Sequence, residues 1–328
     1  MAMPVKAPPP PPPPPSWWSG FVELDGESFL INPQGQALIK TGTATLVAGV
    51  NLTLYKDKTG FINNVTVGGL VASDWSGAGF VAGSYWNNGG ANSTNGALFD
   101  VVFAVSQSVT FAQYWTLSNE FLNVYSLDVQ DTKAVACGLT TCSGFPALIW
   151  DQVKLSLNDS FTGWPITFNP YVLLWYELNS AGSAASGLNM SSAACFPCAV
   201  NNYDFMIGMT PTIDLQKQAG IPVTLKFPTY VTVGPTSFWN AAPGVFGASS
   251  GSVGLFTTGM TAVMPLSWIP GQYGHWYAKA GFQWYDVINT ALQNGNAFSV
   301  DGNLSCAKVS SGDCSSIFVG FGGVGVAF

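Results

Sequence analysis

The sequence predicts an all-β protein: an antiparallel, up-and-down transmembrane β-barrel of about twelve strands. Three observations predict it: apolar and polar residues that alternate, segments longer than ordinary soluble strands, and connections that are short and long in turn. Only 8% of the 328 residues are charged, whereas 48% are hydrophobic; soluble domains carry about 25% charge. No run reaches the ~18 consecutive apolar residues of a spanning helix, so strands that face lipid account best for this composition.

Alternation with a period of two is clearest in residues 203–215. Tyr203, Phe205 and Ile207 share one face there, whereas Asp204 and Thr210 share the other, which is the pattern of a strand between two different environments. Most of the alternating segments exceed the ~5–6 residues of a soluble strand and suit the ~9–11 residues of a tilted transmembrane strand. The predicted strands lie near 18–25, 37–55, 61–73, 97–107, 109–128, 147–157, 165–179, 203–215, 222–235, 252–266, 274–288 and 316–328.

Connection lengths support a barrel of the outer-membrane type, because such barrels have short turns at one end and long loops at the other. With an even number of strands, both termini lie at the short-turn, periplasmic end. A soluble, secreted β-sandwich is the alternative fold. The short connections are 56–60, 106–108, 158–164, 216–221 and 267–273, and the long ones are 74–96, 129–146, 180–202, 236–251 and 289–315.

The chain divides into residues 1–16, a proline-rich periplasmic extension, and residues 17–328, the barrel. Residues 8–15 are all proline and take the polyproline II form, which extends by ~3.1 Å per residue. We expect a spacer here, with a docking ligand for a partner as the alternative. No signal peptide precedes the prolines, and we take the start as a mature or shortened N-terminus.

The chain resembles Gram-negative outer-membrane β-barrel proteins at both ends. It finishes IFVGFGGVGVAF, with Phe328, Val326, Val324 and Phe318 on one face, and near its start MPVKAPPPPP precedes WWSGF. Segments such as YDFMIGMTPTID and PLSWIPGQYGHWYAKAGFQWYDV are similar to twelve-stranded porins and transporters, among them the porins of phenol-degradation pathways. This resemblance implies a bacterial outer-membrane location, recognition of Phe328 by the barrel-assembly machinery, and a small aromatic or otherwise hydrophobic solute.

The cysteines form three local pairs, each inside one predicted long loop. Their even number and short spacing in an exported protein indicate disulfides. Cys195 and Cys198 leave two alternatives: a redox dithiol, which lacks its usual βαβ context, and a zinc site, which needs a second ligand pair. The predicted disulfides join Cys137 to Cys142, Cys195 to Cys198 and Cys306 to Cys314.

Catalytic signals are weak, and we predict no enzyme, no cofactor and no metal. His275 is the single histidine; it begins a strand beside Trp276 and Tyr277, which suits an interfacial aromatic girdle better than a catalytic base. The glycines of residues 320–325 precede no helix, so they form no dinucleotide loop. The formal net charge of −7 argues against nucleic-acid binding.

The polar faces of the strands are predicted to line the lumen, because a charge that faces lipid at the midplane costs roughly 2–4 kcal/mol. These groups either line a pore or fill the interior through salt bridges. The aromatic and apolar residues Tyr171, Leu173 and Trp175 are also predicted to face inward. The pore-lining candidates are Asp100, Glu120, Gln152, Lys154, Asn169, Glu177, Asp204, Asp214, Lys226, Lys279 and Gln283.

The predicted function is a passive outer-membrane channel for small solutes, in a barrel that contacts membrane lipid and is favoured as a monomer. All ten basic residues are lysine and acids outnumber them, so an ionic preference for cations is expected. The alternative is a structural or surface-recognition barrel that does not conduct and carries disulfide-stapled loops. An enzyme that uses His275 ranks third.

Overall fold

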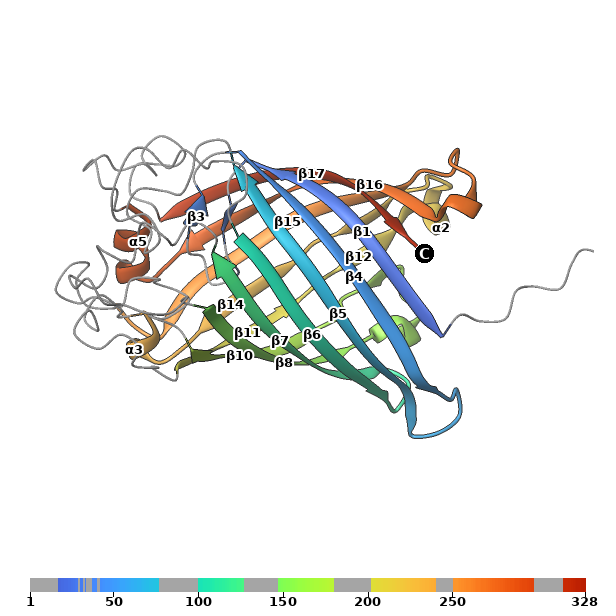
Figure 1. Ribbon diagram of the computed structural model, residues 1–328, viewed down its shortest axis with the longest axis horizontal. Helices are drawn as coiled ribbons and strands as arrows, with labels where there is room; N and C mark the ends of the chain where they lie inside the picture. The colour runs from blue at the N-terminus through green and yellow to red at the C-terminus, as the bar shows by residue number, and fades with distance from the viewer. Residues whose placement is uncertain are drawn as a thin grey trace, which may run out of the picture.

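The computed structural model describes residues 17–28, 30–31, 33, 37–39, 42–76, 100–126, 147–179, 202–239, 250–297 and 315–328. Most of these residues lie in long antiparallel strands (Figure 1). The strands are β1 Trp18–Glu27, β2 Leu30–Ile31, β3 Ala37–Ile39, β4 Thr43–Lys56, β5 Ile62–Ser76, β6 Asp100–Phe111, β7 Trp115–Ser126, β8 Ala147–Leu157, β9 Ile166–Thr167, β10 Tyr171–Asn179, β11 Asn202–Met209, β12 Thr212–Asp214, β13 Thr224–Lys226, β14 Thr229–Val233, β15 Val253–Pro265, β16 His275–Val287 and β17 Ser316–Ala327.

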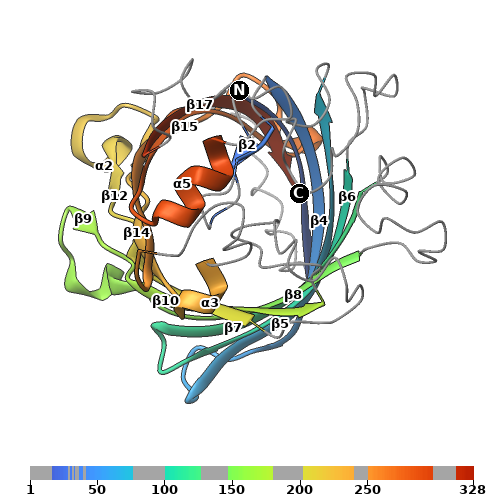
Figure 2. The same cartoon turned by 90° about the vertical axis from the view of Figure 1, so that its left-hand side faces the viewer.

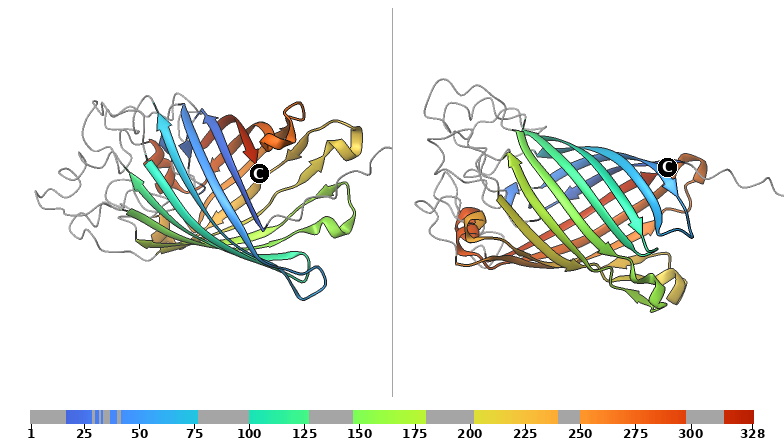
Figure 3. Two further views of the ribbon diagram at one scale, coloured as in Figure 1. Left: turned by 45° about the vertical axis from the view of Figure 1, so that its right-hand side comes forward. Right: turned by 90° about the horizontal axis from the view of Figure 1, so that it is seen from below.

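Twelve of these strands close into one barrel. In ring order they are β1, β4, β5, β6, β7, β8, β10, β11, β14, β15, β16 and β17, and β17 pairs with β1 to close the ring. Every pair of neighbours in the ring is antiparallel, and all but the closing pair follow one another in the chain order of the ring strands, which confirms the up-and-down topology. The last described residue, Phe328, lies at the same end as α2 (Leu215–Ala219) and η4 (Gly271–Tyr273) (Figure 3), which we call the short-turn end.

The two faces of the wall differ in polarity, as the alternation predicts. On β1, Val22 and Leu24 point outward and are exposed, whereas Glu23 and Asp25 point inward. The outward apolar residues continue around the ring; Val105 and Ile207 are 67% and 53% exposed. An apolar outer band around a polar interior is the arrangement of a transmembrane β-barrel.

Inward glycines make room for large inward side chains on neighbouring strands. A Cβ on Gly323 would lie 1.9 Å from Asp25 Oδ1, and one on Gly325 would lie 2.5 Å from the hydroxyl of Tyr277. A Cβ on Gly49 would likewise lie 2.5 Å from the ring of Phe21. The close approach of these side chains to the wall therefore requires glycine.

One predicted turn is wrong. Ser106–Ser108 lies in the middle of β6, and the hairpin turn comes later, at 112–114. Ala112 and Gln113 have φ of 46° and 67° there, and a left-handed backbone at successive turn residues suits the twist of the flanking strands. Backbone N–H groups of this turn donate to Phe61 O at 2.7 Å and to Asn63 Oδ1 at 2.5 Å, so a neighbouring turn stabilises it in place of the usual Asn-Gly sequence.

Three predicted strands are interrupted near the short-turn end. Pro170, Pro211 and Pro228 separate β9 from β10, β11 from β12, and β13 from β14. Proline has no N–H for the ladder and bends a strand, although the carbonyl of Pro211 still accepts from Phe227 N at 2.8 Å. Beyond the bends, β9, β12 and β13 form a small extension of the wall together with η2 (Asp159–Thr162) and α2. The predicted strand 37–55 likewise divides into β3 and β4.

The opposite end of the barrel contains an apolar cluster inside the wall. Helices α3 (Thr236–Trp239) and α5 (Thr290–Ala297) lie within the ring outline in Figure 2. Phe238 and Trp239 from α3 and Leu292 from α5 are buried against the inward residues Leu255 and Ile317. This packing narrows the lumen at the end away from the described termini.

Candidate pore lining

An ionic cluster lies on the inner wall where β17 separates β1 from β16. Lys279 Nζ on β16 contacts Glu23 Oε1 at 2.6 Å and Asp25 Oδ2 at 2.7 Å on β1. The register aligns Lys279 with Gly323 on β17 and Gly323 with Asp25, so the lysine extends across a glycine to reach its partners. Tyr277 donates its hydroxyl hydrogen to Glu23 Oε2. Two carboxylates against one ammonium leave this cluster acidic.

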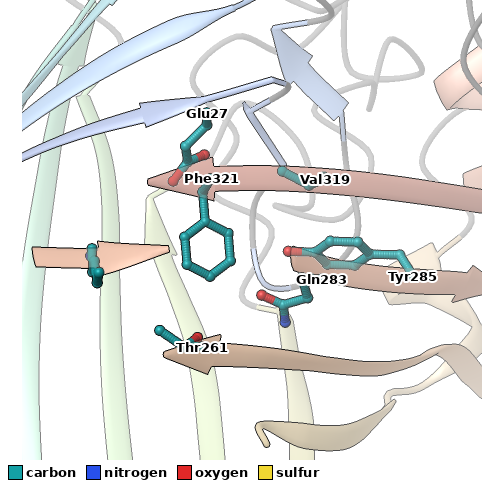
Figure 4. Close-up of a pocket in the computed structure, with 7 residues that line it drawn as sticks. Glu27, Thr261, Gln283, Tyr285, Val319 and Phe321 are labelled. Atoms are coloured by element: carbon teal, nitrogen blue, oxygen red, sulfur yellow. The ribbon is translucent and has the colours of Figure 1, made fainter. Parts of the chain in front are cut away.

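A cavity of about 320 Å³ begins beside this cluster. Figure 4 shows the carboxylate of Glu27 close to the ring of Phe321, with Gln283 and Tyr285 along the neighbouring strand. Its lining combines charged, hydroxyl and amide groups with aromatic surface, a combination typical of sites that hold small molecules. The lining residues are Glu27, Thr261, Lys279, Gln283, Tyr285, Val319 and Phe321.

The second polar region of the inner wall lies on β7, β8 and β10. The register places Glu120 opposite Gln152 and Ser118 opposite Lys154 on the inward face. Lys154 Nζ lies 4.4 Å from the ring centroid of Tyr171, within the range of a cation–π contact. Trp150 and Trp175 lie together farther along the same strands, with ring centroids 5.0 Å apart. An aromatic ring therefore lies beside Lys154, and an aromatic pair follows on the same two strands.

Asp204 occupies a third inward position, on β11. Its exposed fraction is 0%, and the register places it opposite Trp175. It lies close to the apolar cluster, since Met206, two residues later on the same face, belongs to that cluster. Asp204 is thus an acidic group enclosed by protein.

Three other candidates lie near the short-turn end. Asn169 has a φ of 48° beside the proline bend and donates to Thr167 Oγ1 at 3.0 Å. Lys226 is exposed on β13 and pairs with Thr261, which lines the cavity. Asp214 lies outside the twelve-strand ring and corrects the prediction: it is the N-cap of α2 and contacts Lys217 Nζ at 3.2 Å. The alternation that places it on the lumenal face ends at Pro211.

Several predictions fall outside the described residues. The side chains of Asp100 and Glu177, at the ends of β6 and β10, are not among those described. All six cysteines, and with them the three predicted disulfides, lie outside the described ranges, as do residues 1–16.

The acidic residues of β1 were not among the predicted pore-lining residues. Glu23, Asp25 and Glu27 alternate with Val22, Leu24 and Gly26, so the period-two signal was present in a short segment rich in acids. The inward role of Tyr277 was also missed: the prediction gives it an interfacial position beside Trp276, whereas it donates to Glu23 in the interior. His275 begins β16 after η4 at the short-turn end.

Two carboxyl groups outside the membrane-spanning strands have lowered pKa values. At Asp214, slight burial raises the pKa, but hydrogen bonds from Lys217 and Gln216 outweigh this effect and lower the pKa. At Asp57, in the turn after β4, the backbone N–H and the hydroxyl of Thr59 donate to Oδ1 at 2.8 Å and 2.9 Å and lower the pKa. These carboxylates stabilise turns and have no part in the lumen.

The architecture as a whole decides the class of the fold. It joins a closed ring of twelve antiparallel strands, an apolar outer band and a polar interior. The fold is that of an outer-membrane β-barrel. None of the described helices has the length and apolar character needed to span a membrane. In the described part of the chain, no three His, Cys, Asp or Glu side chains converge to hold a metal ion.

Comparison with known proteins gives similarity at the level of structure only. No protein family and no curated protein matches the chain. The solved NanC porin is similar at 10% identity and a TM-score of 0.39, over 94% of this chain and 98% of that one. OprB of Pseudomonas putida has 7% identity and a TM-score of 0.40, over 95% and 93%. The transport unit of the autotransporter AIDA-I of Escherichia coli has 8% identity and a TM-score of 0.36, over 96% and 91%.

Proposed function

We propose that this outer-membrane-type barrel resides in the bacterial outer membrane and acts as a passive, narrow channel for small solutes. The observation that supports this most is the inner wall: polar and charged residues of β1, β15 and β16 converge with apolar residues of β17 around a cavity of about 320 Å³. A wall that serves only to support a barrel has no need of an acidic surface beside open volume. A channel would use that surface directly, because rings of charged side chains set ionic selectivity.

The described inner wall favours cations. Glu23, Asp25 and Lys279 form a cluster with excess negative charge, and Glu27 lies along the adjacent cavity. Glu120 and Lys154 add one charge of each sign on the opposite side. Cations therefore meet an attractive potential along the β1–β16 wall.

The solute class follows from the aromatic groups of the interior. Tyr285 and Phe321 line the cavity, and Tyr171 and Trp175 lie on the inward face of β10. We propose small solutes with aromatic or other apolar parts, in keeping with the resemblance to porins of phenol-degradation pathways. We assign no reaction to the barrel, and His275→Ala is expected to leave its transport unchanged.

The experiment that tests the channel is single-channel recording of the refolded protein in a planar bilayer under a salt gradient. Steady openings with a reversal potential on the cation side are expected, and Glu27→Gln should reduce that potential. Asp57→Asn, which removes one carboxylate from a turn outside the lumen, is the matched control and should leave it unchanged. The absence of current through barrels that are demonstrably folded and inserted would overturn the proposal.

A second candidate function, a barrel that does not conduct, rests on the apolar cluster inside the wall. Phe238, Trp239 and Leu255 are almost completely buried, so this end of the lumen is filled by side chains. A surface-recognition barrel would use its longer connections and would need no open path. The same recording separates the two functions, because this candidate predicts no conductance.

Assembly is a further part of the proposal. Phe328 is 52% exposed and packs edge-to-face on Trp18, with ring centroids 5.6 Å apart. We propose that the barrel-assembly machinery recognises this terminal residue. Phe328→Ser should reduce the amount of folded barrel in cells, measured by heat-modifiable mobility on gels, and leave refolding in detergent largely intact.

A further inference from the structure

The outer face of the barrel carries a hydrogen-bonded polar cluster in the middle of its apolar band. Gln107 on β6, Asn119 on β7 and Asp151 on β8 lie side by side on three neighbouring strands. Gln107 Nε2 donates to Asn119 Oδ1 at 3.4 Å, and Asn119 Nδ2 donates to Asp151 Oδ1. Asn119 Nδ2 also lies 3.3 Å from the carbonyl oxygen of Gln152.

The register places this cluster on the outward face. Val105 opposes Phe121, and Val109 opposes Leu117; all but Val109 are among the exposed large hydrophobic residues. Gln107 and Asn119, paired with each other, lie between these two apolar pairs and share their side of the sheet. Inward neighbours such as Ser106 and Glu120 occupy the alternate positions.

The cluster also lies at membrane depth. On β6, Phe103 and Val105 precede Gln107, and Val109 and Phe111 follow it on the same face; on β8, Val153 and Leu155 lie between Asp151 and the turn. Trp115, at the start of β7, marks the interface at the short-turn end. Amide and carboxylate groups at this depth are costly against lipid tails.

We propose that the β6–β7–β8 face is the contact surface for a second copy of this chain, in a two-fold dimer whose axis is parallel to the membrane normal. Such an axis brings residues of equal depth together, so the polar cluster of one copy meets that of the other without any further adjustment. The interface is isologous, with the same patch on both copies. This replaces the monomer that the sequence favours.

Gln107 gives the pairing its chemistry. It is exposed, and a carboxamide both donates and accepts, so two copies of Gln107 across a two-fold axis form a reciprocal pair of N–H···O bonds. Asn119 accepts a hydrogen bond from the Gln107 amide and itself donates to Asp151, so this chain of hydrogen bonds holds the Gln107 amide in place. Polar side chains associate membrane-spanning segments in this way because lipid offers them no partner. The surrounding Val105, Leu117 and Phe121 supply apolar contact.

The test measures the mass of the refolded barrel in detergent micelles by sedimentation equilibrium over a range of protein-to-detergent ratios. We expect a monomer–dimer equilibrium, and Gln107→Leu should weaken it at least tenfold. A leucine suits the lipid-facing position, so the variant should keep the folded mobility of the barrel. Thr258→Leu is the matched control: Thr258, on the distant strand β15, bonds Thr229 Oγ1 at 2.9 Å, and its loss should leave the equilibrium unchanged.

A second variant keeps the proposal falsifiable if Gln107→Leu folds poorly. Gln107→Cys should give a covalent dimer on mild oxidation in lipid vesicles, in excess of the wild-type chain with its own cysteines. Ile207→Cys, on β11 and similarly exposed, should give no such excess. A single-chain mass at every ratio, a trimer, or equal cross-linking at positions 107 and 207 would overturn the two-fold interface. None of these outcomes depends on conductance, so the channel is tested separately.

Discussion

Two inward lysines in the described part of the membrane-spanning wall are held in different ways. Lys279 contacts two carboxylates, at 2.6 Å and 2.7 Å, on a strand two positions away in the ring. Lys154 lies over the ring of Tyr171, and Glu120, on the adjacent strand, is its acidic neighbour. Lys279 thus belongs to a network of short ion pairs. Lys154 is stabilised by the aromatic ring and by a weaker electrostatic attraction to Glu120. Of these two lysines, one is therefore stabilised by contact with opposite charge and the other by an aromatic face.

The largest expected effect comes from filling the space that the first network requires. In Gly323→Val, the new side chain would displace Asp25 and press on the carbonyl of Leu24. Overpacking combined with a broken ion pair should cost about 3 kcal/mol, measured by urea unfolding of the barrel in lipid vesicles. Gly320→Val on the same strand is the control, since nothing lies within 4 Å of its Cβ position. Equal losses in the two variants would refute the role given to Gly323.

Removal of the lysine itself should have the next largest effect. Lys279→Met leaves Glu23 and Asp25 facing each other without a counter-charge. Breaking a fully buried pair costs roughly 3–5 kcal/mol, and partial exposure to lumenal water screens this one, so we expect about 2 kcal/mol. The same variant should shift the reversal potential further toward cations. A loss no larger than that of Lys154→Met would contradict the comparison.

The second lysine should contribute less. Lys154→Met keeps an unbranched side chain at this position and loses the cation–π contact, worth about 0.5–1 kcal/mol at sites that water reaches. We expect a loss of about 1 kcal/mol in the same unfolding assay. Tyr171→Leu, measured alone and together with Lys154→Met, completes a double-mutant cycle. Strict additivity of the two changes would show that the contact has no energetic value.

The smallest effect is expected where a lysine–carboxylate pair is exposed. Lys217→Met removes the contact to Asp214 at the start of α2 and should leave the unfolding midpoint unchanged. Because the pKa of Asp214 is lowered, its stabilisation of α2 is complete above the ordinary value near 3.8 and is lost as the pH falls through the lowered value. The protection of α2 amides against hydrogen exchange, corrected for the intrinsic exchange rate at each pH, should thus stay constant from pH 7 to pH 5 and fall only below about pH 4. A change near neutral pH would contradict this.

Much of the fold could be predicted from the sequence because the two faces of each strand meet different media. Period-two alternation located the twelve ring strands, and β8 matches its predicted bounds of 147–157. The turn at 112–114 could not be found, since Ala112 and Gln113 carry no turn signal and are held by contacts from a neighbouring turn. The prolines at positions 170, 211 and 228 are themselves a signal for bends. The bends were not predicted, because the alternation of apolar and polar residues continues past each proline.

The site was less predictable than the fold. Gln152, Lys154, Lys279 and Gln283 were named from alternation alone, and the structure places them on the inward face. Which groups contact one another depends on strand register, which a single sequence does not contain. Lys279 and Glu23 are more than 250 residues apart in the chain, and they meet only because the ring closes. The outward polar residues Gln107 and Asp151 likewise become a cluster only through register.

The closing pair of strands has a consequence for the speed of assembly and of opening. β1 and β17 come from the two ends of the barrel domain, so their pairing carries the greatest loop-closure entropy of any neighbouring pair. The contacts of Lys279 with Glu23 and Asp25 span this seam and exist only after closure. Interactions absent from the folding transition state leave the folding rate almost unchanged and slow unfolding. These contacts must break before the barrel opens along this seam, and we expect them to lengthen the lifetime of the closed barrel.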